Sequence, residues 1–402
     1  MKKAAVAFSL PLATLVSSVV LAQEGADAAL LQQQIDALRQ QLILQNQQLF
    51  QLQQQLSATQ TPSGISSPVA EGMTERVEGE PRSPQQGRST EDLLLEQHNV
   101  FDRKFSLEAG LTYTYYDRKD LIFNGFLVLD AIFLGQVDVD RIRAHQWTAD
   151  LTGRYTFNDR WQAELQLPYL YRYSHYYSVG KDGDGRDGIS EHSLNEGGLG
   201  DISAAVFYRL LTETDTSPDL VWNLRVKAPT GRDPYGIPEE RVGGDESNLT
   251  VPTELPTGNG LWALSTGFSA VKTLDPAIIF ASINYTHHLE RSFDDISAAE
   301  GNQPGKVRLG DAFGYGMGMA FALNERLSLS MNFNQQFGKE AEQHPDGGDK
   351  VKIAGSDSNS ASLGMGVTWA MTDKLSLVVN WAAGLTPDAP DYVVGIRLPY
   401  RF

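Results

Sequence analysis

The sequence predicts an all-β membrane protein: a twelve-stranded antiparallel transmembrane β-barrel preceded by a helical N-terminal extension. Apolar and polar residues alternate with period two from residue 104 to the C-terminus, and the connections between the alternating segments are short and long in turn. The last segment keeps the alternation up to a terminal aromatic residue, Phe402. Many segments of about ten residues with this alternation are typical of bacterial outer-membrane barrels.

Composition excludes several other classes. The chain has 402 residues, 33 Lys and Arg against 50 Asp and Glu, a net charge of −17 and no cysteine. So acidic a chain lacks the basic surface that nucleic acids require, and the missing cysteines exclude disulfide scaffolds, thiolate metal sites and cysteine nucleophiles. No long uncharged apolar run follows residue 22, which excludes a polytopic helical membrane protein.

Residues 1–22 read as a secretory signal peptide. Lys2 and Lys3 form its positive start, residues 4–21 are apolar, and Ala22 closes a small-residue cleavage site. A short membrane anchor is the alternative, but the segment lacks a stop-transfer flank. We therefore predict an exported, unlipidated chain in a bacterial envelope.

Residues 23–56 predict a coiled coil. Apolar residues follow one another in steps of four and three, which keeps one seam facing a partner helix. The seam residues are Ala28, Leu31, Ile35, Leu38, Leu42, Leu49, Leu52 and Leu56, with Gln45 as one polar member. We expect a homo-oligomer through this seam, which does not decide between a dimer and a trimer. A single helix lying on the barrel and a glutamine-rich disordered tract are the alternatives.

A linker and a short helix separate the coiled coil from the barrel. Residues 57–89 are rich in Pro, Ser and Gly and almost lack large apolar residues, so we predict a disordered linker. Residues 90–100 predict a plug helix, because a capping box at 89–92 leads into Leu93, Leu94 and Leu95. Two positions stay open for this helix: inside the lumen or beside the barrel mouth.

Residues 101–402 predict the outer-membrane β-barrel. The twelve alternating segments are 104–116, 145–157, 161–172, 201–211, 219–228, 261–272, 278–288, 311–323, 327–338, 361–371, 375–384 and 392–402. The long connections are 117–144, 173–200, 229–260, 289–310 and 339–360. Outer-membrane barrels place short turns in the periplasm and long loops outside the cell, and an even number of strands returns both chain ends to the periplasm. The coiled coil is therefore predicted to be periplasmic.

The inward face of the predicted barrel is polar and charged. Side chains just fill the interior of a barrel of about eight strands, so a barrel of twelve strands leaves an open lumen. The predicted pore-lining residues are Asp150, Arg154, Glu164, Arg209, Asn223, Arg225, Lys227 and Arg397. Because buried charges must be paired or hydrated, this interior indicates a water-filled or plugged channel. The alternative is an internal salt-bridge network that only stiffens the barrel.

Motifs for catalysis or metal binding are weak. His287 and His288 are neighbours on a strand and point to opposite faces, so they do not share a metal. The acidic run 182–188 resembles the start of a calcium loop, but Arg186 stands where an oxygen ligand is needed. We predict no cofactor, no metal and no enzyme. The apolar stretch 121–137 predicts a hairpin or fold-over of the first long loop, either capping the pore or packing as a loop.

Several strings carry a resemblance to known families. Gly198–Ile202 and Lys227–Gly231 resemble the barrel family described as transporters of the phenol meta-degradation pathway. The longer strings resemble bacterial functional-amyloid (Fap) secretion channels; they are 218–224, 229–236, 255–260, 320–329 and 385–391. This resemblance implies a homotrimer that exports unfolded amyloid subunits for biofilm fibres, with the helix around Leu93–Leu95 gating the lumen.

Three functions are weighed on these grounds. Export of an unfolded polypeptide is the main hypothesis, because a small-solute pore does not need a periplasmic coiled coil. Uptake of small hydrophobic or aromatic molecules is the alternative that the broader family resemblance implies. A surface-binding structural barrel is the third. In each, the expected surroundings are outer-membrane lipid, with no nucleic acid as partner.

Overall fold

The computed structural model describes residues 101, 104–128, 131–181, 187–242, 249–274, 277–297 and 302–402. Within these ranges, only the backbone is described for residues 119–140 and 179–189. The predicted signal peptide (1–22), coiled coil (23–56), linker (57–89) and plug helix (90–100) lie outside these residues. No helix among the described residues is long and apolar enough to cross a membrane.

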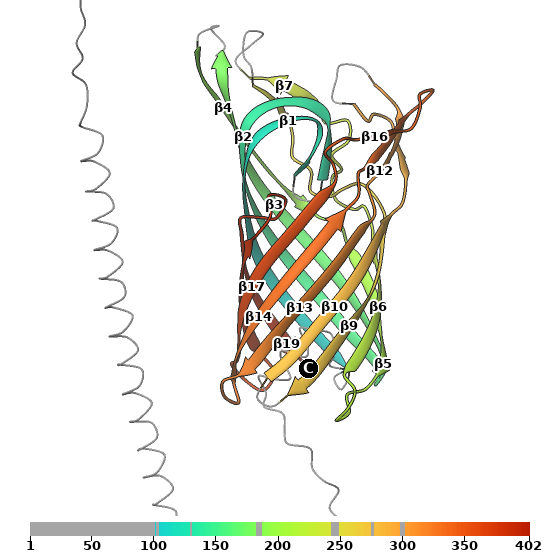
Figure 1. The fold of residues 1–402 in the computed structure, drawn as a ribbon, viewed down its shortest axis with the longest axis vertical. Helices are drawn as coiled ribbons and strands as arrows, with labels where there is room; N and C mark the ends of the chain where they lie inside the picture. Colours follow the sequence, from blue (N-terminus) through green and yellow to red (C-terminus); the bar gives the residue numbers. More distant parts are fainter. Residues whose placement is uncertain are drawn as a thin grey trace, which may run out of the picture. The chain divides into compact units, whose positions relative to one another are not determined.

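Twelve strands of the described chain close into an antiparallel barrel, which confirms the predicted fold class (Figure 1). Each strand pairs with its neighbours in the chain, and β1 closes the ring by pairing with the last strand, β19. The barrel strands are β1 (Phe105–Val128), β2 (Ala131–Asn158), β3 (Trp161–Lys181), β5 (Ser203–Leu211), β6 (Asp219–Lys227), β9 (Ala263–Leu274), β10 (Ala277–His288), β13 (Ala312–Ala322), β14 (Leu327–Gly338), β17 (Ser358–Ala370), β18 (Ser376–Gly384) and β19 (Tyr392–Arg401).

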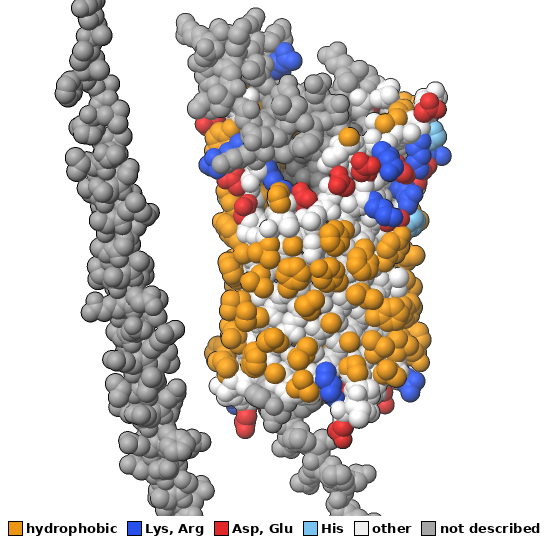
Figure 2. All heavy atoms as spheres, in the orientation of Figure 1, with side chains coloured by type: hydrophobic (Ala, Val, Ile, Leu, Met, Phe, Trp, Pro, Cys, Tyr) orange, Lys and Arg blue, Asp and Glu red, His pale blue; other side chains and the backbone are white. Residues whose placement is uncertain are grey.

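An apolar belt covers the outside of this barrel (Figure 2). The register places Ala109 opposite both Leu398 and Leu151, so outward-facing apolar residues meet across three strands. Exposed fractions of 50% for Leu111, 49% for Ile283 and other large apolar side chains would be costly in water. Aromatic residues flank the belt at both ends; they include Phe105, Tyr155, Trp161, Trp369 and Phe402 at one end and Tyr113, Trp147, Tyr171, Phe313 and Trp262 at the other. An apolar belt between two aromatic girdles fits a bilayer.

The two ends of the barrel differ as predicted. Short turns join β2 to β3 and β13 to β14 at one end, and long connections leave the other. We call these the periplasmic and extracellular ends, following the rule for outer-membrane barrels. The closing strand ends on Phe402, whose ring lies 5.0 Å from that of Phe105 on the first strand.

Two predicted loops are strands instead. The first hairpin extends to Val128 and Ala131, and β3 continues to Lys181 to pair with β4 (Asp187–Leu199). The region 173–200 is so polar that its alternation was hidden: Tyr173 and Tyr177 face outward while Ser174 and Ser178 are buried. For the apolar stretch 121–137, the hairpin is the form found, with a register shift between Asn124 and Phe126.

The extracellular connections fold into small sheets above the barrel. One hairpin consists of β7 (Glu239–Arg241) and β8 (Thr250–Pro252). A second sheet joins β11 (Arg291–Phe293), β12 (Gly305–Arg308), β15 (Glu342–Pro345) and β16 (Val351–Lys352). Their apolar side chains are buried against one another, as for Ile296 and Val307, so the described loops form packed structure over the mouth.

Candidate functional site: the barrel lumen

A buried ion-pair network lines one wall of the lumen. Arg154 on β2 donates through Nε to Glu164 Oε2 on β3 at 2.7 Å and lies 3.3 Å from Glu108 on β1. Arg225 on β6 reaches Glu164 at 2.6 Å, and Arg397 on β19 lies 3.7 Å from Glu108. The network thus runs along the wall from β19 to β6.

The network exists because of strand register. Arg154 and Glu164 are direct partners across β2 and β3, and Ala205 is the direct partner of both Glu164 and Arg225. The small Ala205 lets those two charged side chains meet over it. Arg154 is 5% exposed and Glu164 6%, so their mutual charges are little screened by water. Three guanidinium groups alternate with two carboxylates in this network, so each carboxylate lies between two guanidinium groups.

The opposite wall carries amides and glycines. Along β9, β10, β13, β14, β17 and β18, the inward-facing positions of the described strands hold no Asp, Glu, Lys or Arg. Inward asparagines instead lie opposite glycines: Asn332 opposite Gly318 and Gly364, and Asn380 opposite Gly366 and Gly395. A Cβ on Gly395 would stand 2.7 Å from Asn380 Oδ1. The carboxamides therefore lie flat over glycine, and the wall stays thin and polar.

Phe101 marks the periplasmic half of the lumen. Its side chain is 3% exposed and packs against Ala205, Phe207 and Val221, inward-facing residues of β5 and β6. The guanidinium of Arg209 lies 4.2 Å from the centre of its ring and also pairs with Asp219 at 3.2 Å. The chain before β1 is thus anchored inside the barrel by one aromatic side chain.

Asp201 organises the extracellular ends of β5 and β6. Its carboxylate accepts hydrogen bonds from the main-chain N–H groups of Gly231 at 3.1 Å and Asn259 at 3.0 Å, and Lys227 Nζ lies 3.8 Å away. A Cβ on Gly258 would collide with this carboxylate. Asp201 therefore holds both ends of the 229–260 loop on the rim.

Two threonines complete this anchor in the same way. Thr230 donates to the carbonyl of Gly200 at 2.7 Å, and Thr257 donates to that of Leu199 at 2.8 Å. Each belongs to a Pro-Thr-Gly string, at 229–231 and 256–258. The strings 198–202 and 227–231, which resemble the phenol-pathway family, thus converge with the string 255–260 on one structural node.

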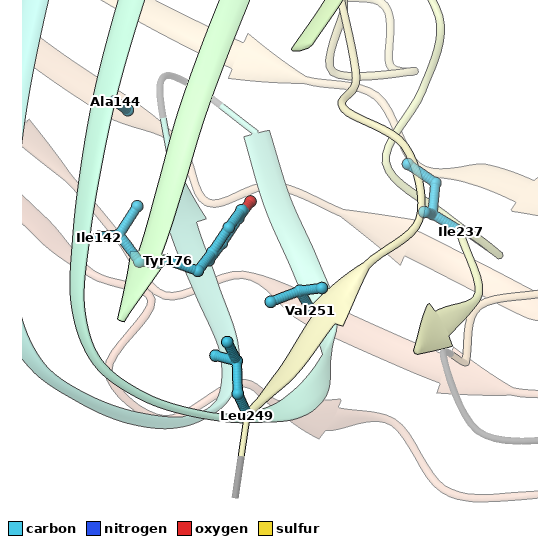
Figure 3. Close-up of a cluster of buried hydrophobic side chains, with 6 residues drawn as sticks. All are labelled: Ile142, Ala144, Tyr176, Ile237, Leu249 and Val251. Carbon is cyan, nitrogen blue, oxygen red and sulfur yellow. The ribbon is translucent and has the colours of Figure 1, made fainter. Parts of the chain in front are cut away.

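From this anchor the 229–260 loop folds into the extracellular mouth (Figure 3). Its side chains Ile237, Leu249 and Val251 pack against Ala144 and Tyr176, two inward-facing residues of β2 and β3, and Ile142 completes the cluster. Leu249 is 0% exposed. The loop therefore narrows the lumen from outside and is held there by apolar contacts as well as by Asp201.

We expect Asp201→Ala to release this loop. The substitution removes two hydrogen bonds to a carboxylate and leaves Lys227 without its partner, a loss of about 3 kcal/mol for the loop anchor. The measurement is single-channel conductance in planar bilayers, which should rise. Conductance equal to that of the unmodified chain would mean that the loop does not restrict the mouth.

A pH effect is expected at the β7–β8 hairpin. Partial burial raises the pKa of Glu239 from 4.5 to about 7. A raised pKa in the fold means that the hairpin is most stable below the ordinary pKa and loses stability as pH rises through about 7. Trypsin cleavage at the exposed Arg241 should therefore be faster at pH 8 than at pH 6, relative to Glu239→Gln at the same pH. Equal ratios at both pH values would contradict this.

The predicted pore residues lie at four places in the barrel. Arg154, Glu164, Arg225 and Arg397 belong to the ion-pair network, and Asp150 lies on the same wall opposite Gly110. Arg209 sits at the periplasmic half, Lys227 at the extracellular anchor, and Asn223 faces the lumen opposite Gly267. That they line a conducting pore stays a prediction, as do the roles of the plug residues and the coiled-coil seam.

Sequence reasoning missed two residues that matter for the site. Glu108 lies on the polar face of the first strand, and that signal could have placed it with Arg154. Phe101 is a single large apolar residue among polar neighbours before the first strand, a weaker signal. His287 and His288 were rightly separated: His287 bonds to Asp311 at 2.8 Å and His288 to the carbonyl of Gly310 at 2.9 Å.

Comparison with known families places the chain. The sequence profile of the family described as "Putative MetA-pathway of phenol degradation" matches residues 171–402. The chain belongs to this family. The match includes the three strings that meet at Asp201, and it confirms the broader of the two resemblances that the sequence carries.

Three solved structures are similar to this chain. An outer-membrane channel from Pseudomonas putida F1 is 15% identical with a TM-score of 0.50, covering 76% of this chain and 97% of that chain. The translocator domain of the autotransporter NalP from Neisseria meningitidis is 9% identical with a TM-score of 0.41, over 78% and 94%. The toluene transporter TodX from P. putida is 9% identical with a TM-score of 0.37, over 74% and 90%. The likeness to the Pseudomonas putida F1 structure shows that this member of the phenol MetA-pathway family has the fold of an outer-membrane channel.

Proposed function

We propose that this chain is a gated outer-membrane channel that takes up small hydroxylated aromatic molecules. The observation that carries the proposal is the lumen: the carboxylates of the network on one wall are held in ion pairs, and the other wall is uncharged amide. Such a lumen favours small polar neutral solutes over ions. The family description names phenol degradation, and a phenol combines a small ring with one hydrogen-bonding hydroxyl.

The family description favours this uptake function over amyloid export, the main hypothesis from the sequence. Pure hydrocarbons fit the lumen less well than phenols, because they would lie against carboxamides and hydroxyls without replacing the hydrogen bonds those groups make to water.

Export of an unfolded polypeptide is the second candidate, and a specific observation favours it. A wall of carboxamides over glycine offers both donors and acceptors to a peptide backbone, as Asn284 does opposite Gly267 and Gly314. The longer sequence strings resemble the amyloid secretion channels in the same region. In this case the predicted coiled coil of residues 23–56 would join the copies of a trimer.

We propose that the gate is the chain segment before Phe101. Phe101 is held inside the lumen, and the predicted plug residues Leu93, Leu94 and Leu95 precede it by six to eight positions. Because Phe101 lies inside the lumen, the segment that precedes it can enter the lumen directly. This supports the inner of the two positions left open for the plug helix.

The uptake proposal is tested in porin-deficient Gram-negative cells that express the full chain. We expect labelled phenol to enter these cells faster than cells carrying the empty vector, because the lipopolysaccharide leaflet slows its unassisted passage. A matched variant is Asn332→Leu/Asn380→Leu, which replaces two lumen carboxamides with apolar groups of similar size. Phenol should enter cells that express this variant more slowly than cells that express the unmodified chain.

A second assay in the same cells tests export. A disordered glutamine-rich polypeptide with a signal peptide is co-expressed, and its exposure to external protease is measured. One pair of results would make export the favoured function and uptake the second candidate. In it, the polypeptide becomes sensitive to protease only in cells that contain the channel, and phenol uptake equals that of cells carrying the empty vector.

A further inference from the structure

The amide wall of the lumen contains a recess. It has a volume of about 290 Å³ and lies where β10, β13, β14 and β17 meet. Its lining includes Ser282, Asn284, Gly314, Gly316, Asn334 and Gln336. These positions alternate with the lipid-facing Ile283, Phe313 and Phe337, so the recess opens toward the lumen.

The floor of the recess depends on glycine. A Cβ on Gly314 would stand 2.5 Å from Asn284 Oδ1, and a Cβ on Gly316 would stand 2.5 Å from Asn334 Oδ1. Real Cβ atoms do not approach so closely, so any other residue would push these carboxamides toward the axis. Glycine at both positions therefore creates the depth of the recess.

The carboxamides around this floor are available to a ligand. Within the described part of the chain, the side chains of Asn284, Asn334 and Gln336 make no hydrogen bond, and Asn284, Asn334 and Gln336 are all exposed to the lumen. Each carboxamide offers two donors and one acceptor oxygen. An open set of neutral donors and acceptors is the pattern that amide groups complement.

The carboxamides also repeat at a distance that an extended peptide shares. Asn332, Asn334 and Gln336 occupy every second position of β14 and point inward. Residues two apart on a strand are about 6.8 Å apart, and side chains on one side of an extended peptide repeat at the same spacing. A phenol has one hydroxyl and would use one of these groups at a time.

We propose that this recess is a binding subsite for the amide groups of an extended, uncharged polypeptide segment lying along β14. The proposal rests on the lumen being open to solutes, and it deepens the second of the two functions above. Charged segments are disfavoured here, because the acidic and basic groups that could pair with them lie on the wall from β19 to β6.

The test is equilibrium binding of a fluorescent peptide of alternating Gly and Gln, with blocked ends, to the purified full chain in detergent, followed by anisotropy. We expect saturable binding that weakens about tenfold in Asn334→Ala/Gln336→Ala, because two hydrogen-bonding groups are lost. Gly316→Ala should weaken it as well, since it fills the floor. The matched control is Asn223→Ala, a lumen carboxamide on β6 outside the recess, which should bind like the unmodified chain.

Two results overturn the subsite. One is peptide affinity that is equal in the unmodified chain and in Asn334→Ala/Gln336→Ala, with both folded by circular dichroism. The other is a neutral oligosaccharide of similar length that displaces the fluorescent peptide as well as the unlabelled peptide does. This would mean that the recess binds hydroxyl groups in general. The binding assay needs no conduction, so a chain that binds the peptide but admits no phenol would contradict the uptake function alone.

Discussion

Arg154→Met should destabilise the barrel by about 3 kcal/mol, because it takes from two buried carboxylates the guanidinium that they share. Glu108 would keep its 3.7 Å contact with Arg397, and Glu164 would keep its ion pair with Arg225. The measurement is the urea midpoint of unfolding in lipid vesicles, which should fall.

Two matched variants isolate the cause of this loss. Arg397→Met removes a guanidinium from the same network at its longest contact, and its side chain is 22% exposed, so the urea midpoint should fall by less. Arg154→Met/Glu164→Gln removes a positive and a negative charge together and should recover part of the stability. A double variant no more stable than Arg154→Met would mean that packing, rather than charge pairing, holds this wall.

Phe101→Ala should open the channel. The ring is buried against Ala205, Phe207 and Val221, and truncating a buried phenylalanine costs about 3 kcal/mol, which shifts a two-state equilibrium by about a hundredfold. If the segment before Phe101 closes the lumen, the closed state loses this energy and the open state loses none. Single-channel recordings of the full chain should show a large rise in open probability.

The control for this variant is Phe105→Ala. Phe105 is the same residue type near the same end of the barrel, but it faces outward, where its exposed fraction is 38% and its ring lies 5.0 Å from that of Phe402. Its truncation should lower stability in the membrane and leave open probability unchanged. An open probability that rises equally in both variants would indicate a general loosening of the barrel.

Alternation along the strands made most of the barrel predictable. The barrel strands β6, β9, β10, β13, β14, β17, β18 and β19 were placed within three residues at each end, since lipid on one side and a polar lumen on the other enforce period two. The extension of β3 and its pairing with β4 were missed, because above the membrane both faces are polar and period two fades. Tyr173 and His175 look like loop residues by composition, although their strand continues.

The inward-facing residues of the candidate site were predictable from the sequence, but the contacts between them were less so. Arg154, Glu164 and Arg225 were placed on the inward face, but their pairing depends on register across four strands and on the small Ala205 between two of them. The glycines opposite Asn332 and Asn380 could not be paired from sequence, because alternation places residues on a face of the sheet but does not set the register between neighbouring strands. Loop packing at Leu249 and Val251 is tertiary and leaves no periodic signal.

One measurement tests the gated channel most directly. The chain has no cysteine, so Phe101→Cys/Phe207→Cys introduces a single pair of thiols between residues that pack together in the lumen. The full chain is recorded in planar bilayers after treatment with a short bifunctional thiol crosslinker that is cleaved by reductant. We expect a low, steady conductance while the crosslink is intact and transitions to a higher conductance after reduction. The same conductance before and after reduction would contradict a lumen closed by the chain at Phe101.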